Sequence, residues 1–166
     1  MVNGHGGPAL DALMTAASNR VLLLGIAAAA AIYLGLRSVH RWTAAVVLLL
    51  AIAGADLVSV RLVKPAVDRV RPCHTLASVR APSGCGSGKS FPSAHASTTA
   101  AAAVIALWAS PVLAPLAVAL AALVGVSRVY LGVHYPSDVV AGWILGGALG
   151  AALVVLARFR HAVRVR

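Results

Sequence analysis

Long apolar runs constrain the fold of this chain more than any other feature of its sequence. Spanning a bilayer takes about 20 apolar residues in an α-helix, with a usable range of about 17 to 25. Three of the runs meet that length, and the other two need a few flanking residues to reach it. The sequence therefore predicts an all-α integral membrane bundle of about five transmembrane helices, over roughly Val21–Leu36, Thr43–Val63, Ala94–Trp108, Val112–Leu131 and Val139–Ala157.

Composition favours a membrane protein over a soluble or nucleic-acid-binding one. Hydrophobic residues make up 60% of the 166 residues and charged residues 11%, whereas a soluble domain carries about 25% charged residues. A net charge of +10 would suit nucleic acid, but the basic residues lie in the gaps between apolar runs and form no single basic domain. We therefore expect the lipid bilayer as partner and no nucleic acid.

The gaps between the runs indicate how the helices connect. The gaps RSVHRW and SPV are short enough to make their neighbours antiparallel, whereas residues 64–93 form one long polar insertion. We expect a single domain over residues 1–166. No lysine or arginine precedes Arg20 to form the n-region of a signal peptide. Within residues 1–20, the mildly amphipathic stretch Ala9–Ala17 fits an interfacial helix and disorder equally well.

Charge in the short loops predicts the orientation of the chain. With five spans, the RSVHR turn and the C-terminal RFRHAVRVR lie on one side and together carry six arginines. The positive-inside rule makes that side, with the C-terminus, cytoplasmic and places the 64–93 loop at the outer, periplasmic face of a cytoplasmic membrane. That loop is also basic, so its cations contest the rule unless they have another role.

Three polar clusters interrupt the apolar pattern: KPAVDRVRP at residues 64–72, PSAH at 92–95 and SRVYLGVHYPSD at 127–138. The first follows the second span, the next opens the third span, and the last joins the fourth span to the fifth. Alternating spans bring all three to the same membrane face. Segment counting alone therefore predicts that they form one site.

The basic residues of these clusters suit a phosphate group. Lys64 and Arg71 are seven residues apart, which places them on one helical face if the segment stays helical, although Pro65 leaves that open. With Arg128 they make three cations, enough to bind a phosphate dianion. The alternative is that such residues snorkel at the membrane edge. We prefer that interpretation for Arg61, Arg69, Arg80 and Lys89.

PSAH has the pattern of a helix start. Ser93 can cap the helix, and the free N–H groups near Ala94 and His95 then form an anion site at the positive end of the helix dipole. Ala94 is small enough for a ligand to approach the backbone. Taken alone, the motif is weak, because a serine cap followed by one histidine is more often structural.

His134 and Asp138 form the candidate catalytic pair. Pro136 suits the first turn of the fifth span, which puts Asp138 within reach of the His134 ring. A carboxylate on one ring nitrogen makes the other a better nucleophile. A bound phosphate dianion would keep His95 protonated as a general acid. A lone histidine is more often a satisfied polar group, which is our interpretation of His5, His40, His74 and His161.

Metal and thiol chemistry are the weaker alternatives. His95, His134 and Asp138 could form a zinc ligand set, but three nearby cations would repel a divalent ion, so we expect no metal and no cofactor. Cys73 and Cys85 bracket the outward loop and could form a disulfide there, which the sequence alone does not show. Asp56 lies inside the second span, where a carboxylate needs a partner, so we predict a structural pair with a cation or hydroxyl.

The motif residues, taken in order, resemble the three-part signature of the type 2 phosphatidic acid phosphatase (PAP2) superfamily, which contains lipid phosphatases and vanadium haloperoxidases. The matching residues are Lys64-x6-Arg71-Pro72, Pro92-Ser93-Ala94-His95 and Ser127-Arg128-x5-His134-x3-Asp138. Ala94 stands where the pattern usually has glycine; alanine keeps the backbone N–H and adds only a methyl group.

The resemblance implies a PAP2/haloperoxidase-like helical core and a metal-independent phosphatase working through a phosphohistidine, with its site at the outer membrane–water boundary. It assigns catalysis to His134, Asp138 and His95. It assigns phosphate binding to Lys64, Arg71, Ser93, Ala94 and Arg128.

A membrane setting points to a lipid phosphate as substrate, and haloperoxidase relatives are soluble and much larger. Our first choice is a small bacterial phosphatase acting on undecaprenyl or another polyprenyl pyrophosphate. Phosphatidylglycerophosphate, lipid A and decaprenyl-phosphate sugar phosphates are the alternatives. A further alternative is a membrane protein that only binds anionic headgroups, which would not require His134, Asp138 and His95 together. The oligomeric state is left open.

Overall fold

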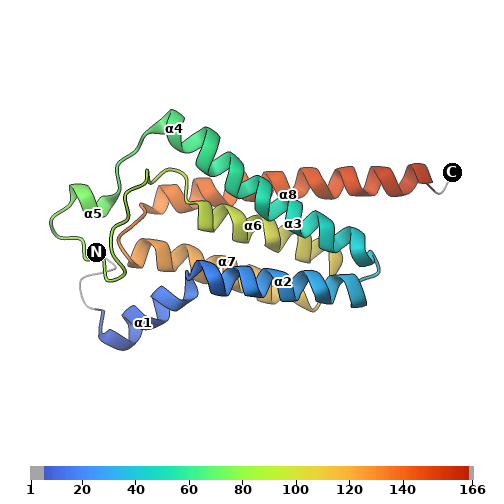
Figure 1. Cartoon of the computed structure of the whole chain (residues 1–166), viewed down its shortest axis with the longest axis horizontal. Helices are drawn as coiled ribbons and strands as arrows, with labels where there is room; N and C mark the ends of the chain where they lie inside the picture. Colours follow the sequence, from blue (N-terminus) through green and yellow to red (C-terminus); the bar gives the residue numbers. More distant parts are fainter. Residues whose placement is uncertain (1–5, 165–166) are drawn as a thin grey trace.

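Helix boundaries follow the breaks in the apolar runs. In the computed structural model, residues 6–164 are described, with side chains to residue 160, and this part of the chain contains helices and no strand. The helices form an elongated bundle (Figure 1). They are α1 Pro8–Ala17, α2 Arg20–Arg37, α3 Arg41–Leu57, a π-helical segment Val58–Val63, α4 Lys64–Val67, α5 Pro72–Thr75, α6 Ala94–Ala109, α7 Leu113–Tyr130 and α8 Pro136–Arg164.

The predicted membrane bundle is confirmed, with one adjustment to its span count. Four helical segments in the described part are long and apolar enough to cross a membrane, whereas α6 has only 16 residues. At about 1.5 Å per residue, α6 is shorter than a hydrocarbon core of about 30 Å. It is also the central helix, packed against α3, α7 and α8, and eight of its residues are buried. Neighbouring helices therefore cover α6.

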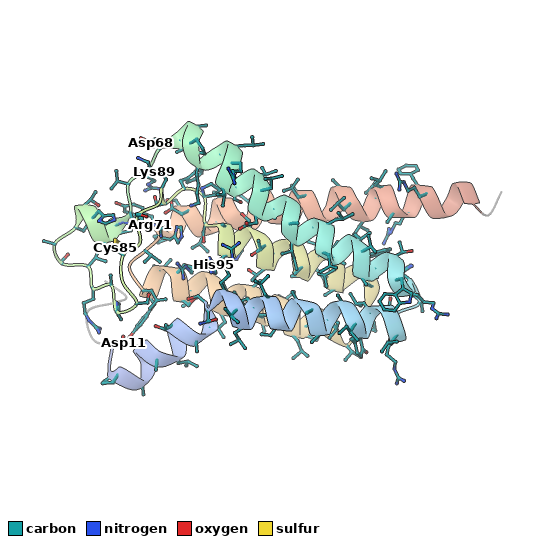
Figure 2. All side chains as sticks on the ribbon, in the orientation of Figure 1. Asp11, Asp68, Arg71, Cys85, Lys89 and His95 are labelled. Atoms are coloured by element: carbon teal, nitrogen blue, oxygen red, sulfur yellow. A yellow bond between two sulfur atoms is a disulfide. The ribbon has the colours of Figure 1, made fainter. Side chains whose placement is uncertain are left out.

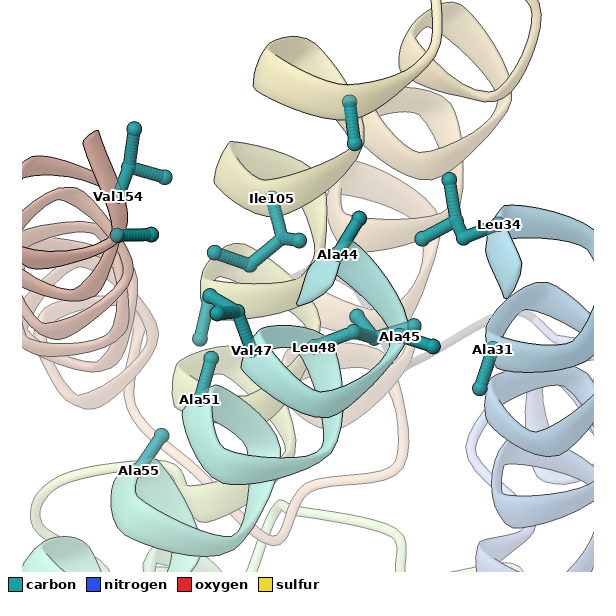
Figure 3. Close-up of a cluster of buried hydrophobic side chains, with 13 residues drawn as sticks. Ala31, Leu34, Ala44, Ala45, Val47, Leu48, Ala51, Ala55, Ile105 and Val154 are labelled. Atoms are coloured by element: carbon teal, nitrogen blue, oxygen red, sulfur yellow. The ribbon is translucent and has the colours of Figure 1, made fainter. Parts of the chain in front are cut away.

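Small residues bring α8 into close contact with α6. A Cβ at Gly142 would lie 2.6 Å from the Ser93 carbonyl oxygen, and one at Gly146 would overlap the Ser97 carbonyl oxygen. Glycine at these positions, one turn apart, allows the two backbones to approach, as is common between helices in lipid. Buried alanine, valine and leucine side chains of α3 form one hydrophobic cluster with Ile105 of α6 and Val154 of α8 (Figure 3).

The topology places all three polar clusters at one end of the bundle. The α2–α3 turn and the end of α8 lie at the opposite end, as Figure 1 shows. At the cluster end lie α4, the loop that contains α5, the start of α6 and the α7–α8 connection. The prediction made by counting spans is therefore confirmed.

The helix that carries Lys64 ends too early for Lys64 and Arg71 to lie on one helical face. It passes through the π-helical segment and ends at Val67, and Asp68 takes a left-handed conformation with φ 53°. Arg71 lies beyond it in extended backbone. The condition of an uninterrupted helix is therefore not met, and the loop rather than helical periodicity brings Arg71 toward the site.

The N-terminal stretch forms a helix, so disorder is wrong for Pro8–Ala17, while residues 1–5 lie outside the described residues. Helix α1 packs beside α7. Its Met14 contacts a buried cluster formed by Tyr130, Leu131 and Val133. An interfacial position of α1 in a membrane stays a prediction.

Candidate active site

The three clusters border one cavity of about 1340 Å³. Figure 2 shows Arg71 on the loop and His95 at the start of α6, both at the cluster end of the bundle. Six of the eight residues assigned to the site line the cavity, and they are Lys64, Arg71, Ala94, His95, Arg128 and His134. Ser93 and Asp138 are fully buried behind this wall.

His134 and Asp138 are adjacent, as their spacing predicted. Nδ1 of His134 lies 3.4 Å from Oδ2 of Asp138, and the two side chains are 3% and 0% exposed. The same Oδ2 accepts a hydrogen bond of 2.9 Å from the Tyr135 N–H. Helix α8 begins at Pro136, so its first turn holds the Asp138 carboxylate next to the His134 imidazole. With Nδ1 facing the carboxylate, Nε2 is the nitrogen left for a ligand in the cavity.

Burial and the surrounding cations keep His134 neutral. The pKa of this histidine is lowered from 6.5 to about 4: desolvation by burial is the largest cause, Asp138 raises the pKa, and the positive charges of Arg128 and Arg71 lower it. A neutral imidazole keeps the lone pair that a nucleophile needs. The site therefore holds an uncharged histidine near neutral pH.

Arg69 is a site residue that the sequence interpretation missed. Its Nη1 donates hydrogen bonds of 2.8 Å to both Oδ1 of Asp138 and Oγ of Ser137. Its guanidinium also lies over the Tyr135 ring, 3.9 Å from the centroid. The membrane-edge interpretation of Arg69 is thus corrected, because this cation fixes the carboxylate that contacts His134. The signal in the sequence was the scarcity of carboxylates, since a buried aspartate needs a partner.

Lys64 and Arg71 both hold the polar loop. Lys64 Nζ donates to the carbonyl oxygens of Lys89 at 2.7 Å and Pro92 at 2.9 Å. Arg71 donates from Nε to the Gly88 carbonyl at 2.7 Å and from Nη1 to the Val133 carbonyl at 3.1 Å. The two cations therefore line the cavity and also determine the path of the segment that leads into α6.

The SFPSAH stretch starts α6 as predicted. Ser93 is the N-cap, and its Oγ accepts from the Ala96 N–H at 3.4 Å. The Ser93 N–H donates to the Asp138 carbonyl at 2.9 Å, which joins the start of α6 to the first turn of α8. Ala94 and His95, not Ser93, face the cavity.

Arg128 is held from the N-terminal segment. Its Nη1 donates a 2.9 Å hydrogen bond to Oγ of Ser18. Its Nε is buried and has no hydrogen-bond partner among the described residues. Ser18 lies far from every motif in the sequence, and no local pattern marks it as a site residue.

Carboxylates neutralise part of the positive charge at this end. The chain has four acidic residues, and each forms an ion pair: Arg20–Asp56, Arg69–Asp138, Arg80–Asp11 and Lys89–Asp68. The predicted structural pair of Asp56 is confirmed, with Arg20 as its partner. Within the described residues, the cations of the cavity wall that have no carboxylate partner are Arg61, Lys64, Arg71 and Arg128.

The polar loop is closed by a disulfide. Cys73 and Cys85 are bonded, with their Cα atoms 5.8 Å apart. Next to the disulfide, Nε2 of His74, the residue after Cys73, lies 2.9 Å from the carbonyl oxygen of Gly86, the residue after Cys85. The bond limits the freedom of the loop that carries Gly88 and Lys89 to the cavity.

The rest of the cavity is apolar. From the site it continues between α2, α3, α6 and α7, along side chains that include Leu23, Ala27, Ile52, Ala102 and Leu116. It reaches Leu34 near the end of α2 and Leu113 at the start of α7. A charged pocket thus opens into a long apolar groove.

Fold and site together define a helical membrane protein whose cationic pocket presents two histidines to an anion. A model of the PAP2 superfamily matches residues 44–162, which include all three clusters. The chain belongs to the PAP2 superfamily.

The chain is similar to known bacterial phosphatases and to a solved membrane structure. The chain is 42% identical over 105 residues to a decaprenylphosphoryl-5-phosphoribose phosphatase of Mycobacterium tuberculosis, covering 63% of this chain and 57% of that protein. It is 32% identical to a lipid A 4'-phosphatase of Bacteroides thetaiotaomicron, covering 87% and 68%. The crystal structure of a transmembrane PAP2 type phosphatidylglycerolphosphate phosphatase from Bacillus subtilis superposes with a TM-score of 0.72 at 29% identity, covering 92% and 79%. The chain thus spans little more than half of the mycobacterial relative.

Proposed function

We propose that this protein is a metal-independent lipid phosphatase that works through a phosphohistidine. The observation that carries the proposal is the His134–Asp138 pair, which faces, with His95, a pocket walled by cations. A protein that only binds anionic headgroups needs the cations but not a neutral histidine held by a buried carboxylate. The intact pair therefore favours an enzyme.

The residues divide the reaction between them. Nε2 of His134 forms a bond to phosphorus while the bond between phosphorus and the leaving oxygen breaks. Burial lowers the pKa of His95 to about 3, and the bound phosphate dianion offsets this, so that His95 is protonated in the complex and gives the leaving oxygen its proton. A water molecule then attacks the phosphohistidine, and its proton goes to His95. Inorganic phosphate leaves, and His134 is restored. Lys64, Arg71 and Arg128, together with the backbone N–H at Ala94, stabilise the charge on the transferring phosphoryl group.

We propose a polyprenyl pyrophosphate, such as the undecaprenyl lipid, as the substrate. The charged pocket would take the terminal phosphates and the apolar groove the hydrocarbon chain. The second candidate is a decaprenyl-phosphate sugar phosphate, because the 42% identical relative is named for that substrate. Both candidates present a phosphate on a polyprenyl-linked headgroup.

The orientation that fits this function places the site at the outer face of a cytoplasmic membrane and the end of α8 in the cytoplasm. The α2–α3 turn and the end of α8 lie opposite the site in Figure 1. These segments carry Arg37, Arg41, Arg158 and Arg160. The disulfide in the loop also suits an oxidising compartment. Labelling of single cysteines introduced at Val39 and Ser87 from outside intact cells tests this orientation: Ser87→Cys should react and Val39→Cys should not.

A phosphate-release assay in detergent tests the function. Polyprenyl pyrophosphate, decaprenylphosphoryl-5-phosphoribose, phosphatidylglycerophosphate and lipid A are compared with and without EDTA. We expect the polyprenyl pyrophosphate to be preferred, EDTA to have no effect, and His134→Ala to abolish release. Activity that disappears with EDTA contradicts the metal-free reaction, and activity that survives His134→Ala contradicts the nucleophile. No release from any of the lipids by the folded protein favours the headgroup-binding alternative.

A further inference from the structure

A buried serine from outside the matched family region contacts the anion site. The family model begins at residue 44, whereas Ser18 directly follows α1. Ser18 is 6% exposed. Its hydroxyl donates to the Met14 carbonyl at 3.2 Å and accepts from Nη1 of Arg128 at 2.9 Å. Because a serine hydroxyl has a single proton, the bond to Met14 leaves its lone pairs for the guanidinium.

This contact decides which edge of the Arg128 guanidinium is free. An arginine holds phosphate best through two parallel N–H bonds from one edge. Ser18 occupies Nη1, whereas Nε is buried and has no hydrogen-bond partner among the described residues. The edge formed by Nε and Nη2 therefore stays available, and Arg128 and His134 line the same cavity. An unpaired, buried N–H of a residue that lines the cavity indicates where an anion would bind.

Helix α1 is fixed to the element that carries Arg128. Asp11 accepts a 2.6 Å hydrogen bond from the Tyr130 hydroxyl, two residues after Arg128 on α7. The same carboxylate forms a 2.5 Å ion pair with Arg80 of the polar loop. Met14, whose carbonyl holds the Ser18 hydroxyl, packs against the cluster that includes Tyr130. Figure 2 shows Asp11 on α1 at the cluster end. The position of Ser18 is thus set by contacts of α1 with α7 and with the polar loop.

We propose that Ser18 is a positioning residue, which turns the Nε–Nη2 edge of Arg128 toward a substrate phosphate, and that α1 holds it there through Asp11. The inference rests on the proposed phosphatase function. It assigns a part in the site to a segment that the three motifs do not include.

The test compares Ser18→Ala and Ser18→Thr with Ser38→Ala, all in the full chain in detergent. Ser38 is a matched control, because it is also buried, donates a 2.9 Å hydrogen bond to the Ala109 carbonyl, and belongs to the α2–α3 turn at the opposite end. For each variant the measurements are kcat and KM with polyprenyl pyrophosphate, the dissociation constant of orthovanadate by calorimetry, and the unfolding temperature.

We expect Ser18→Ala to weaken vanadate binding and lower kcat/KM by about tenfold, the effect of about 1.4 kcal/mol. Ser18→Thr, which keeps the hydroxyl, should stay within about threefold of the original protein, and Ser38→Ala should lower only the unfolding temperature. Unchanged vanadate affinity in Ser18→Ala overturns the proposal. If the original protein releases no phosphate from any lipid, the proposed function fails, but the vanadate measurement still decides the role of Ser18.

Discussion

Arg69 Nη1 lies 2.8 Å from Asp138 Oδ1, while Oδ2 of the same carboxylate lies 3.4 Å from Nδ1 of His134. The carboxylate is thus held between a loop cation and the candidate nucleophile. Asp138 is fully buried, and leaving a buried carboxylate without its cation is unfavourable. We therefore expect Arg69, which does not line the cavity itself, to act on the proposed reaction through Asp138 and His134.

Replacing Arg69 should lower activity through the orientation of His134. A charge-assisted hydrogen bond contributes about 1.5–3 kcal/mol, so we expect Arg69→Leu to reduce kcat by about 10- to 100-fold, with a smaller change in KM. Arg69→Lys should recover part of kcat, because an ammonium can still reach one carboxylate oxygen. The matched control is Lys89→Met, which removes a more exposed ion pair with Asp68. Equal effects of Arg69→Leu and Lys89→Met on kcat would contradict this role.

The pKa of His134 predicts the acid limb of the pH profile. Burial, the largest effect, lowers this pKa to about 4, so protonation removes the nucleophile only as the pH falls toward 4. An ordinary histidine, with a pKa of about 6.5, would already be mostly protonated at pH 5.5. We expect imidazole nitrogen signals of His134, assigned by their loss in His134→Gln, to show a neutral ring at pH 5.5 in the unliganded protein. A titration midpoint above 6 would refute the argument.

The contact between α6 and α8 predicts a contrast between two neighbouring glycines. A Cβ at Gly146 would overlap the Ser97 carbonyl, whereas one at Gly147 has no atom within 4 Å. Overpacking of this kind costs about 1–3 kcal/mol, and glycine to alanine in a helix otherwise stabilises by up to about 1 kcal/mol. Gly146→Ala should therefore lower the unfolding temperature in detergent, and Gly147→Ala should leave it unchanged or raise it. Equal temperatures for the two variants would mean that the helices do not pack this closely.

The sequence carries enough information to predict where the motifs meet, but not how each side chain is held. Alternating spans bring the clusters to one end whatever the packing. The four-residue spacing from His134 to Asp138, with a helix that begins at Pro136, brings the carboxylate to the imidazole. By contrast, Arg69 reaches Asp138 across a loop whose path depends on the left-handed residue Asp68. Ser18 reaches Arg128 only because α1 packs on α7. Contacts of this kind are set by tertiary packing and leave no periodic pattern in the chain.

Arg61 yields the last prediction, because its charge has no carboxylate partner among the described residues although it lines the cavity. It lies in the π-helical turn Val58–Val63, one turn before Lys64. π-Helical turns are frequent at functional sites, and an unpaired cation in a membrane span is costly without an anionic partner. Our membrane-edge interpretation accounts for Arg61 equally well, so the two interpretations have to be separated by substrate charge.

If Arg61 contributes to anion binding, Arg61→Gln should raise KM for a polyprenyl pyrophosphate about 3- to 10-fold. The substitution should raise KM less for a polyprenyl monophosphate, because that headgroup has one phosphate fewer with which to reach a further cation. Arg158→Gln, which removes the same charge at the far end of α8, is the control for net charge and should leave both KM values unchanged. The comparison is made at two salt concentrations, since a charge contact at a water-filled pocket weakens as salt rises. Identical KM values for Arg61→Gln and Arg158→Gln would assign Arg61 to the membrane edge.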